Sequence, residues 1–150
     1  HSVKSIDEII SEAESSGAAT IIVTGGEPLM YDLSSLTKKL KNKKFKLHLE
    51  TSGAYPLTGE WDWICFSPKK FKEPLTGIFS QANELKVIIY NKDDFRFAEE
   101  NEKYVTDNCV LYLQPEWSRR EAMLPLIIDY VKRNPLWRIS LQTHKYIGIP

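Results

Sequence analysis

Polar residues follow each of six short apolar runs along the chain, and their types suit the binding of a small polar molecule. A pair of glycines and an acid follow the first run, and an acid, two hydroxyls and a glycine follow the second. In parallel α/β sheets, ligands bind at the carboxyl ends of the strands, so we expect these residues to face one basin. The six polar segments are residues 25–28 (GGEP), 50–53 (ETSG), 67–69 (SPK), 90–93 (YNKD), 114–117 (QPEW) and 142–145 (QTHK).

Taken singly, each of these segments has an ordinary structural explanation. Two glycines after a strand usually form a turn, and Glu-Pro commonly begins a helix. A lone histidine close to a chain end is commonly an exposed surface residue. Six such segments in succession, with acidic, basic and amide groups, nevertheless favour a shared site for a small molecule.

The residue types in this basin fit a ligand that resembles an amino acid. Adjacent glycines let a ligand approach the backbone closely, and Glu27 or Glu50 is suited to accept hydrogen bonds from an ammonium group. Ser67 and Lys69 are suited to a carboxylate or to ribose hydroxyls. Asparagine, glutamine and histidine edges match a heterocycle that carries donors and acceptors on its rim.

Helical and strand-like segments alternate along the chain, which predicts an α/β fold with a mostly parallel six-stranded sheet. Ser5 and Glu8 form a capping-box pair at the start of the first helix, and Pro125 predicts a kink or a late start in the last one. We expect residues 1–150 to form one domain, either open or partly closed as a barrel. The expected strands are 20–24, 45–50, 61–66, 85–90, 110–114 and 137–142, and the expected helices are 5–16, 33–42, 74–81, 94–104 and 119–133.

Composition excludes several classes of partner. Lysine plus arginine and aspartate plus glutamate are equal at 20 each, which argues against nucleic acid or an anionic membrane as a partner. No apolar run approaches the roughly 20 residues of a membrane span, and no signal-peptide pattern is present. Cys65 and Cys109 lie in apolar, strand-like runs, so we expect buried, reduced thiols and a cytoplasmic protein.

At the level of motifs, the chain resembles the 7-carboxy-7-deazaguanine synthases, a family of radical S-adenosylmethionine (SAM) enzymes. VTGGEP resembles the SAM-binding strand of radical SAM enzymes, and it is followed in order by LETSG, FSPK, NELKVII, LQPEW and SLQTHKYIGIP. The resemblance extends from about residue 5 to residue 150, and the C-terminal QTHK and GIP are its most specific part. It implies a partial (β/α) barrel of the radical SAM type.

The resemblance also implies roles for individual residues. Gly25, Gly26 and Glu27 match the motif that holds the SAM amino group. Glu50 and Ser67 match contacts to the SAM ribose and its polar groups, and we expect Lys69 and Gln114 to contact SAM as well. His144 and the carboxylate of Pro150 match substrate contacts, and the carboxylate is expected to accept hydrogen bonds from the edge of a pterin.

The implied reaction is a ring contraction of 6-carboxy-5,6,7,8-tetrahydropterin to 7-carboxy-7-deazaguanine, in queuosine biosynthesis. The implied cofactors are SAM, a [4Fe–4S] cluster and Mg²⁺, with flavodoxin or ferredoxin as the reductant and a homodimer as the assembly. The cluster needs three protein thiolates from a CxxxCxxC-type loop, and the two widely spaced cysteines do not match it. We therefore expect an N-terminally truncated form that lacks the first barrel strand and the cluster loop and is inactive alone; a degenerate paralogue is the less favoured explanation.

Two other functions remain open from the residues. Another radical SAM enzyme, of the organic-radical-activating kind, would share GGEP, although QTHK favours the deazapurine family. A non-catalytic α/β nucleotide-binding module would explain the missing cluster cysteines.

Overall fold

The computed structural model describes residues 4–149, and helices and strands alternate along that range. The strands are β1 Thr20–Val23, β2 Lys46–Thr51, β3 Trp63–Phe66, β4 Glu84–Ile89, β5 Val110–Pro115 and β6 Trp137–Ile139. The helices are α1 Ile6–Ser15, α2 Ser34–Asn42, α3 Asp93–Glu102, α4 Arg120–Arg133 and α5 Thr143–Tyr146, with 3₁₀ turns η1 Pro28–Met30, η2 Thr76–Ile78 and η3 Trp117–Arg119.

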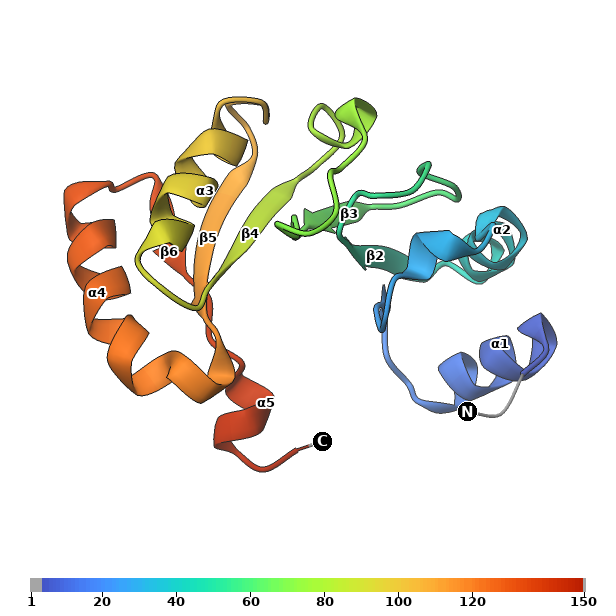
Figure 1. Ribbon diagram of the computed structural model, residues 1–150. Helices are drawn as coiled ribbons and strands as arrows, with labels where there is room; N and C mark the ends of the chain where they lie inside the picture. The colour runs from blue at the N-terminus through green and yellow to red at the C-terminus, as the bar shows by residue number, and fades with distance from the viewer. Residues whose placement is uncertain (1–3, 150) are drawn as a thin grey trace.

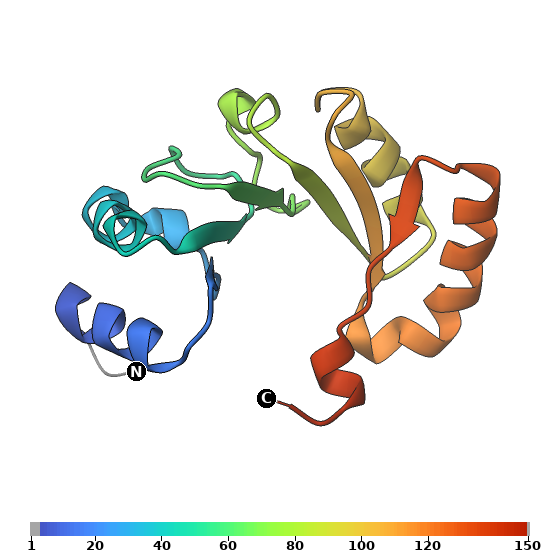
Figure 2. The same ribbon diagram turned by 180° about the vertical axis from the view of Figure 1, so that it is seen from behind.

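The six strands form one sheet in the order of the chain, β1 to β6, and every neighbouring pair is parallel. Figures 1 and 2 show that this sheet curves into an arch, with α1, α2, α3 and α4 on its convex side. The expected α/β fold with a parallel sheet is confirmed. Because all the strands run the same way, their carboxyl ends lie along one edge of the arch.

The two faces of the arch differ in polarity. Along β2, β4 and β5, side chains alternate between buried and partly exposed. The convex face carries the apolar core under the helices, with Leu49, Phe66, Leu85 and Leu113 fully buried. Within residues 4–149, the concave face has no such helix layer, and the side chains that line its cavity include acids, lysines and amides. The polar side chains on the concave side are therefore not part of the apolar core and are available to a ligand.

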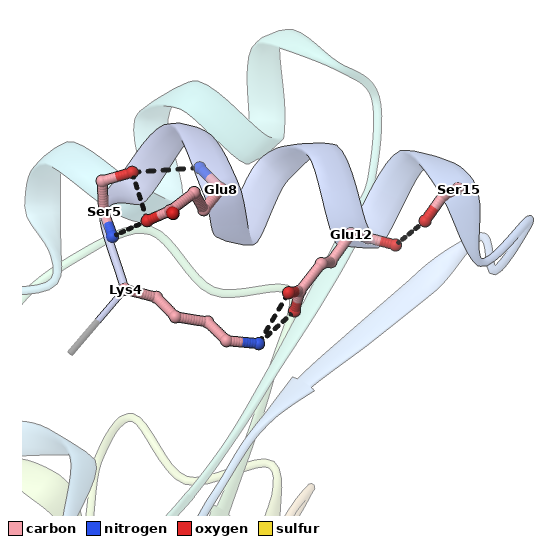
Figure 3. A network of polar contacts seen from close by, with 5 residues as sticks. All are labelled: Lys4, Ser5, Glu8, Glu12 and Ser15. Atoms are coloured by element: carbon pink, nitrogen blue, oxygen red, sulfur yellow. Dashed lines mark hydrogen bonds and ion pairs between the residues drawn. The ribbon is translucent and has the colours of Figure 1, made fainter. Parts of the chain in front are cut away.

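The predicted capping box sets the start of α1 (Figure 3). Ser5 Oγ accepts a hydrogen bond from the Glu8 backbone N–H at 3.3 Å, and the Glu8 carboxylate accepts one from the Ser5 N–H at 2.6 Å. Lys4 adds an exposed ion pair with Glu12 at 2.6 Å. These contacts satisfy N–H groups that the first helical turn leaves unpaired. They orient the helix so that its apolar side packs against α2 and β2 around Leu40 and Leu47.

Two segments differ from the sequence-based expectation by more than a shift of one or two residues at their ends. The last strand ends at Ile139 rather than at residue 142, and the short helix α5 follows it. The segment 74–81 holds only the 3₁₀ turn Thr76–Ile78. Helix α4 agrees with the expectation: it begins at Arg120, continues through Pro125 and bends along its length, as predicted from this proline (Figure 1).

Candidate functional site

A cavity of about 450 Å³ lies on the concave side at the carboxyl ends of the strands. Its lining comes from segments that follow or end β1, β2, β3, β5 and β6, so distant parts of the sequence meet there, as predicted. Seven of the nine predicted site residues line it: Gly25, Gly26, Glu50, Ser67, Lys69, Gln114 and His144. Pro150 lies outside the described residues.

Glu27, also predicted for this site, is not among the lining residues. Its side chain turns back to cap η1, accepting a hydrogen bond from the Leu29 N–H at 3.2 Å. The same carboxylate accepts bonds from Thr51 Oγ1 at 2.6 Å, from the Ser52 N–H at 2.8 Å and from Ser52 Oγ. Burial works to raise the pKa of the Glu27 carboxyl, but the bonds from Ser52 and Thr51 outweigh it and lower the pKa. Glu27 therefore holds the loop after β2 in place.

Glu50 and Lys86 form an ion pair on the cavity wall. Lys86 Nζ lies 2.7 Å from Glu50 Oε1, and Thr24 Oγ1 lies 3.4 Å from the other carboxylate oxygen. Burial alone would lower the pKa of the Lys86 ammonium, and the nearby Glu50 carboxylate contributes to a net rise. No role for Lys86 was predicted from the sequence, although a lysine within the apolar run LKVII indicates a polar position in a strand.

Lys69 brings a second ammonium group into the cavity from the loop after β3. Its Nζ donates to Ser67 Oγ at 3.3 Å, and a short antiparallel bridge between Lys69 and Lys72 fixes the loop backbone. Burial, followed by the positive charge of Lys86, lowers the pKa of Lys69. A carboxylate placed between these two lysines would relieve their mutual repulsion.

Gln114 and His144 close the side of the cavity formed by the last two strands. The Gln114 side chain is buried and accepts a hydrogen bond from Ser140 Oγ at 3.1 Å, which fixes its orientation. His144 is carried by α5, whose four residues include none that is buried. The position of His144 thus depends on whatever holds α5 against the rest of the chain.

Trp117 supplies that anchor. Its ring meets Tyr146 edge-to-face at 5.0 Å between centroids, and Lys145 lies over the same ring at 5.3 Å. Arg120 covers the ring at 4.4 Å and donates to the Trp117 carbonyl at 2.9 Å, so the indole is itself held firmly. The motif QPEW thus positions the motif QTHK.

Replacing Trp117 with alanine is expected to release α5. The aromatic pair and the cation–π contact together stabilise the docked helix by about 1–2 kcal/mol, so amide exchange over residues 143–147 should quicken roughly tenfold. Hydrogen–deuterium exchange followed by mass spectrometry measures this directly. Phe71→Ala is the matched control, since Phe71 is an 88% exposed aromatic. Equal exchange in W117A and the unaltered chain would contradict the anchoring role.

Further lining residues were not assigned to the site from the sequence. Thr51 and Ser52 belong to a recognised strand-end segment, whereas Glu84 and Lys86 lie within β4 and Ser140 follows β6. For Glu84, Lys86 and Ile88, the signal is the alternation of partly exposed and buried positions along β4, which marks the concave face. The full set of further lining residues is Thr24, Thr51, Ser52, Glu84, Lys86, Ile88, Ser140, Leu141 and Gln142.

The two cysteines are free and buried, as expected. Burial raises the pKa of both thiols, that of Cys109 to about 11. Within residues 4–149, no group of three or more histidine, cysteine, aspartate or glutamate residues is arranged to hold a metal ion. The same range includes no helix that is both long and apolar enough to span a membrane.

An arched parallel sheet with a polar cavity at its carboxyl edge defines an α/β protein of the partial-barrel class, with a site for a small polar molecule. No family model matches the chain. It is 57% identical to the 7-carboxy-7-deazaguanine synthase of Flavobacterium psychrophilum, over 95% of this chain and 68% of that protein. It is 48% identical to the 7-carboxy-7-deazaguanine synthase of Synechocystis sp., over 99% of this chain and 71% of that protein. The chain belongs to the 7-carboxy-7-deazaguanine synthase family of radical SAM enzymes.

The solved structures agree with this assignment. The crystal structure of QueE from Escherichia coli superimposes with a TM-score of 0.78 at 30% identity, covering 93% of this chain. The chain spans 64% of the length of that protein. The sequence similarities favour this family over the other two functions considered from the residues, the organic-radical-activating enzymes and a non-catalytic nucleotide-binding module.

Proposed function

We propose that the cavity binds SAM together with a reduced pterin, and that the protein catalyses ring contraction of 6-carboxy-5,6,7,8-tetrahydropterin to 7-carboxy-7-deazaguanine. The observation that carries this proposal is the meeting of seven motif residues in one polar cavity of a chain from this family. The reaction class is that of a carbon–nitrogen lyase, because ring contraction expels ammonia. The other proposed attributes are a single domain over residues 1–150, a cytoplasmic location and a homodimer.

The residues around the cavity suit the parts of SAM. A Cβ placed on Gly25 or Gly26 would meet no atom within 4 Å, so open space lies beside this backbone for the SAM ammonium group to approach its carbonyls. Glu50 and Ser67 are placed to accept hydrogen bonds from the ribose hydroxyls, and Lys69 to pair with the SAM carboxylate. Gln114 offers an amide to the adenine edge. When bound, SAM supplies the hydrogen-abstraction chemistry that begins the ring contraction.

The described residues do not fit a [4Fe–4S] cluster. Such a site needs three thiolates with SAM on the remaining iron, whereas Cys65 and Cys109 are buried, protonated thiols that do not line the cavity. In the proposed enzyme, the cluster ligands therefore have to come from other residues. Mg²⁺ and a flavodoxin or ferredoxin reductant belong to the proposal on the strength of the family alone.

For the pterin, the proposal assigns His144 and the Pro150 carboxylate as contacts. His144 lines the cavity, and the backbone turns sharply four residues after it, at Gly148. Gly148 has a φ of 70°, and the Ile149 N–H donates to the His144 carbonyl at 2.9 Å. This bend holds Ile149 close to α5, and it supports the proposed role for the chain end in substrate binding.

Selective SAM binding by the 150-residue chain tests the proposal. We expect SAM to bind at least about tenfold more tightly than adenosine, because one charge-assisted hydrogen bond to the methionine part is worth about 1.5 kcal/mol. Isothermal titration calorimetry with each ligand measures the ratio. Lys69→Met should reduce SAM affinity and leave adenosine affinity unchanged, whereas the exposed Lys103→Met should alter neither. Equal affinity of the unaltered chain for SAM and adenosine would sink the proposed SAM site.

A further inference from the structure

Lys86 is a largely buried cation on the concave face, and the proposed SAM and pterin contacts give it no role. It lies in the middle of β4, paired in register with Tyr112 of β5, between the buried apolar residues Leu85 and Val87. Its side chain is 13% exposed and lines the cavity. Burying an ammonium group costs free energy unless it has a charged partner. Lys86 therefore needs such a partner on the concave face.

The charged and titratable groups around Lys86 are Glu50, Glu84, Cys65 and Lys69. Glu84 is engaged elsewhere, since its two oxygens accept from Trp63 Nε1 at 3.1 Å and from Cys65 Sγ at 3.3 Å. Lys69 donates to Ser67. The 2.7 Å bond from Lys86 Nζ to Glu50 Oε1 is thus the specific charged contact of this ammonium group.

We propose that Lys86 is a positioning residue that acts through Glu50. It holds Oε1 of the Glu50 carboxylate, leaving Oε2, which has only a 3.4 Å contact from Thr24, directed to a ligand donor. The Glu50 side chain is 41% exposed and lines the cavity, so a ligand there can reach its carboxylate while Lys86 holds Oε1. The donor is a hydroxyl or N–H group of the ligand, in the proposed function a ribose hydroxyl of SAM.

The physical basis is preorganisation. A free glutamate side chain has several rotamers, and ordering it when a ligand binds costs free energy. An ion pair to a lysine fixed within a strand has already ordered that carboxylate before the ligand arrives. Arginine at position 86 would retain a cation that can reach Glu50, whereas glutamine or methionine would remove the charge.

The test is a double-mutant cycle on SAM binding, measured by calorimetry on the full 150-residue chain. This inference rests on the proposed function, so SAM affinity of the unaltered chain is measured first. Lys86→Gln and Glu50→Gln are each expected to weaken SAM binding about tenfold, the size of one hydrogen bond to a charged group. The variant with both changes should bind no more weakly than E50Q alone, because Lys86 acts only through Glu50. Lys86→Arg should restore affinity to within about threefold of the unaltered chain.

Each other outcome has a definite meaning. If K86Q binds SAM as tightly as the unaltered chain, the positioning role is wrong while the SAM site stands. If the K86Q and E50Q losses add fully, Lys86 contacts the ligand itself and the proposal is again wrong. If the unaltered chain fails to bind SAM, the proposed function and this inference fall together. Circular dichroism checks folding of each variant, and Lys86→Met replaces K86Q in the cycle if K86Q is unfolded.

Discussion

Gly53→Ala is expected to destabilise the chain by about 2–5 kcal/mol, the sum of left-handed backbone strain and overpacking. Gly53 has a φ of 73°, a conformation that side chains disfavour. A Cβ at this position would lie 2.8 Å from Phe66 Cε2 and 2.9 Å from Ile78 Cγ2. Both neighbours are buried in the main core, where side chains are closely packed. Urea unfolding followed by tryptophan fluorescence measures the loss.

Gly17→Ala is the matched control for this prediction. Gly17 also has a positive φ, of 68°, but an added Cβ would meet nothing within 4 Å. The G17A variant should therefore lose only the stability due to backbone strain, about 1–2 kcal/mol. The difference between the two variants isolates the steric contribution of Phe66 and Ile78. Equal losses in G53A and G17A would show that the core accommodates the extra methyl group.

The number of strands and their parallel direction could be predicted because each apolar run is bounded by turn residues and separated from the next by a helix-length connection. The end of the chain could not. The apolar and polar residues of 137–142 read as one extended run, yet β6 stops at Ile139 and α5 begins at Thr143. A four-residue helix has too little periodicity to be recognised locally. It is held by Trp117, a contact that depends on two segments meeting in space.

The site was predictable to the extent that it is built from strand ends. Gly25, Ser67 and His144 follow strands, and topology alone brings them together. Lys86 lies inside a strand, so the same rule could not find it. Glu27 follows a strand end, as expected, but its carboxylate bonds to Ser52 and Leu29 and is not among the groups that line the cavity, so its contact with SAM stays a prediction. Side-chain direction within a turn depends on hydrogen bonds that the sequence does not specify on its own.

Asp94→Asn is expected to cost about 3 kcal/mol of stability at neutral pH, the range for hydrogen bonds to a buried charged group. The Asp94 carboxylate is buried and accepts from the Tyr90 N–H at 2.7 Å and the Asn91 N–H at 2.8 Å, and it pairs with Lys70. Both carboxylate oxygens of Asp94 accept hydrogen bonds, Oδ1 from Lys70 and Oδ2 from the two backbone N–H groups. Asparagine has only one acceptor oxygen, so its NH₂ group would face either Lys70 or the backbone donors. The loop from Ser67 to Lys70 would lose its ion pair with α3, which should also weaken SAM binding.

The pH dependence of this loss identifies the carboxylate as its source. Burial works to raise the pKa of Asp94, but the Lys70 ammonium and the Asn91 and Tyr90 N–H groups outweigh it, so the folded pKa lies below the usual value. Asp94 therefore adds its full stability above the unfolded pKa of about 3.9 and loses it as the pH falls through the lower, folded pKa. The difference in unfolding free energy between the unaltered chain and D94N should be constant from about pH 6 to about pH 8, which is roughly two to four units above the unfolded pKa. This difference should become smaller in acid.

Asp93→Asn, at the adjacent and exposed position, is the control and should cost no more than about 0.5 kcal/mol, a weak helix-dipole effect in the first turn of α3. Urea unfolding at a series of pH values gives both differences from the same experiment. A D94N loss as small as that of D93N, or one that does not narrow in acid, would show that the Lys70–Asp94 pair does not hold this edge of the site together.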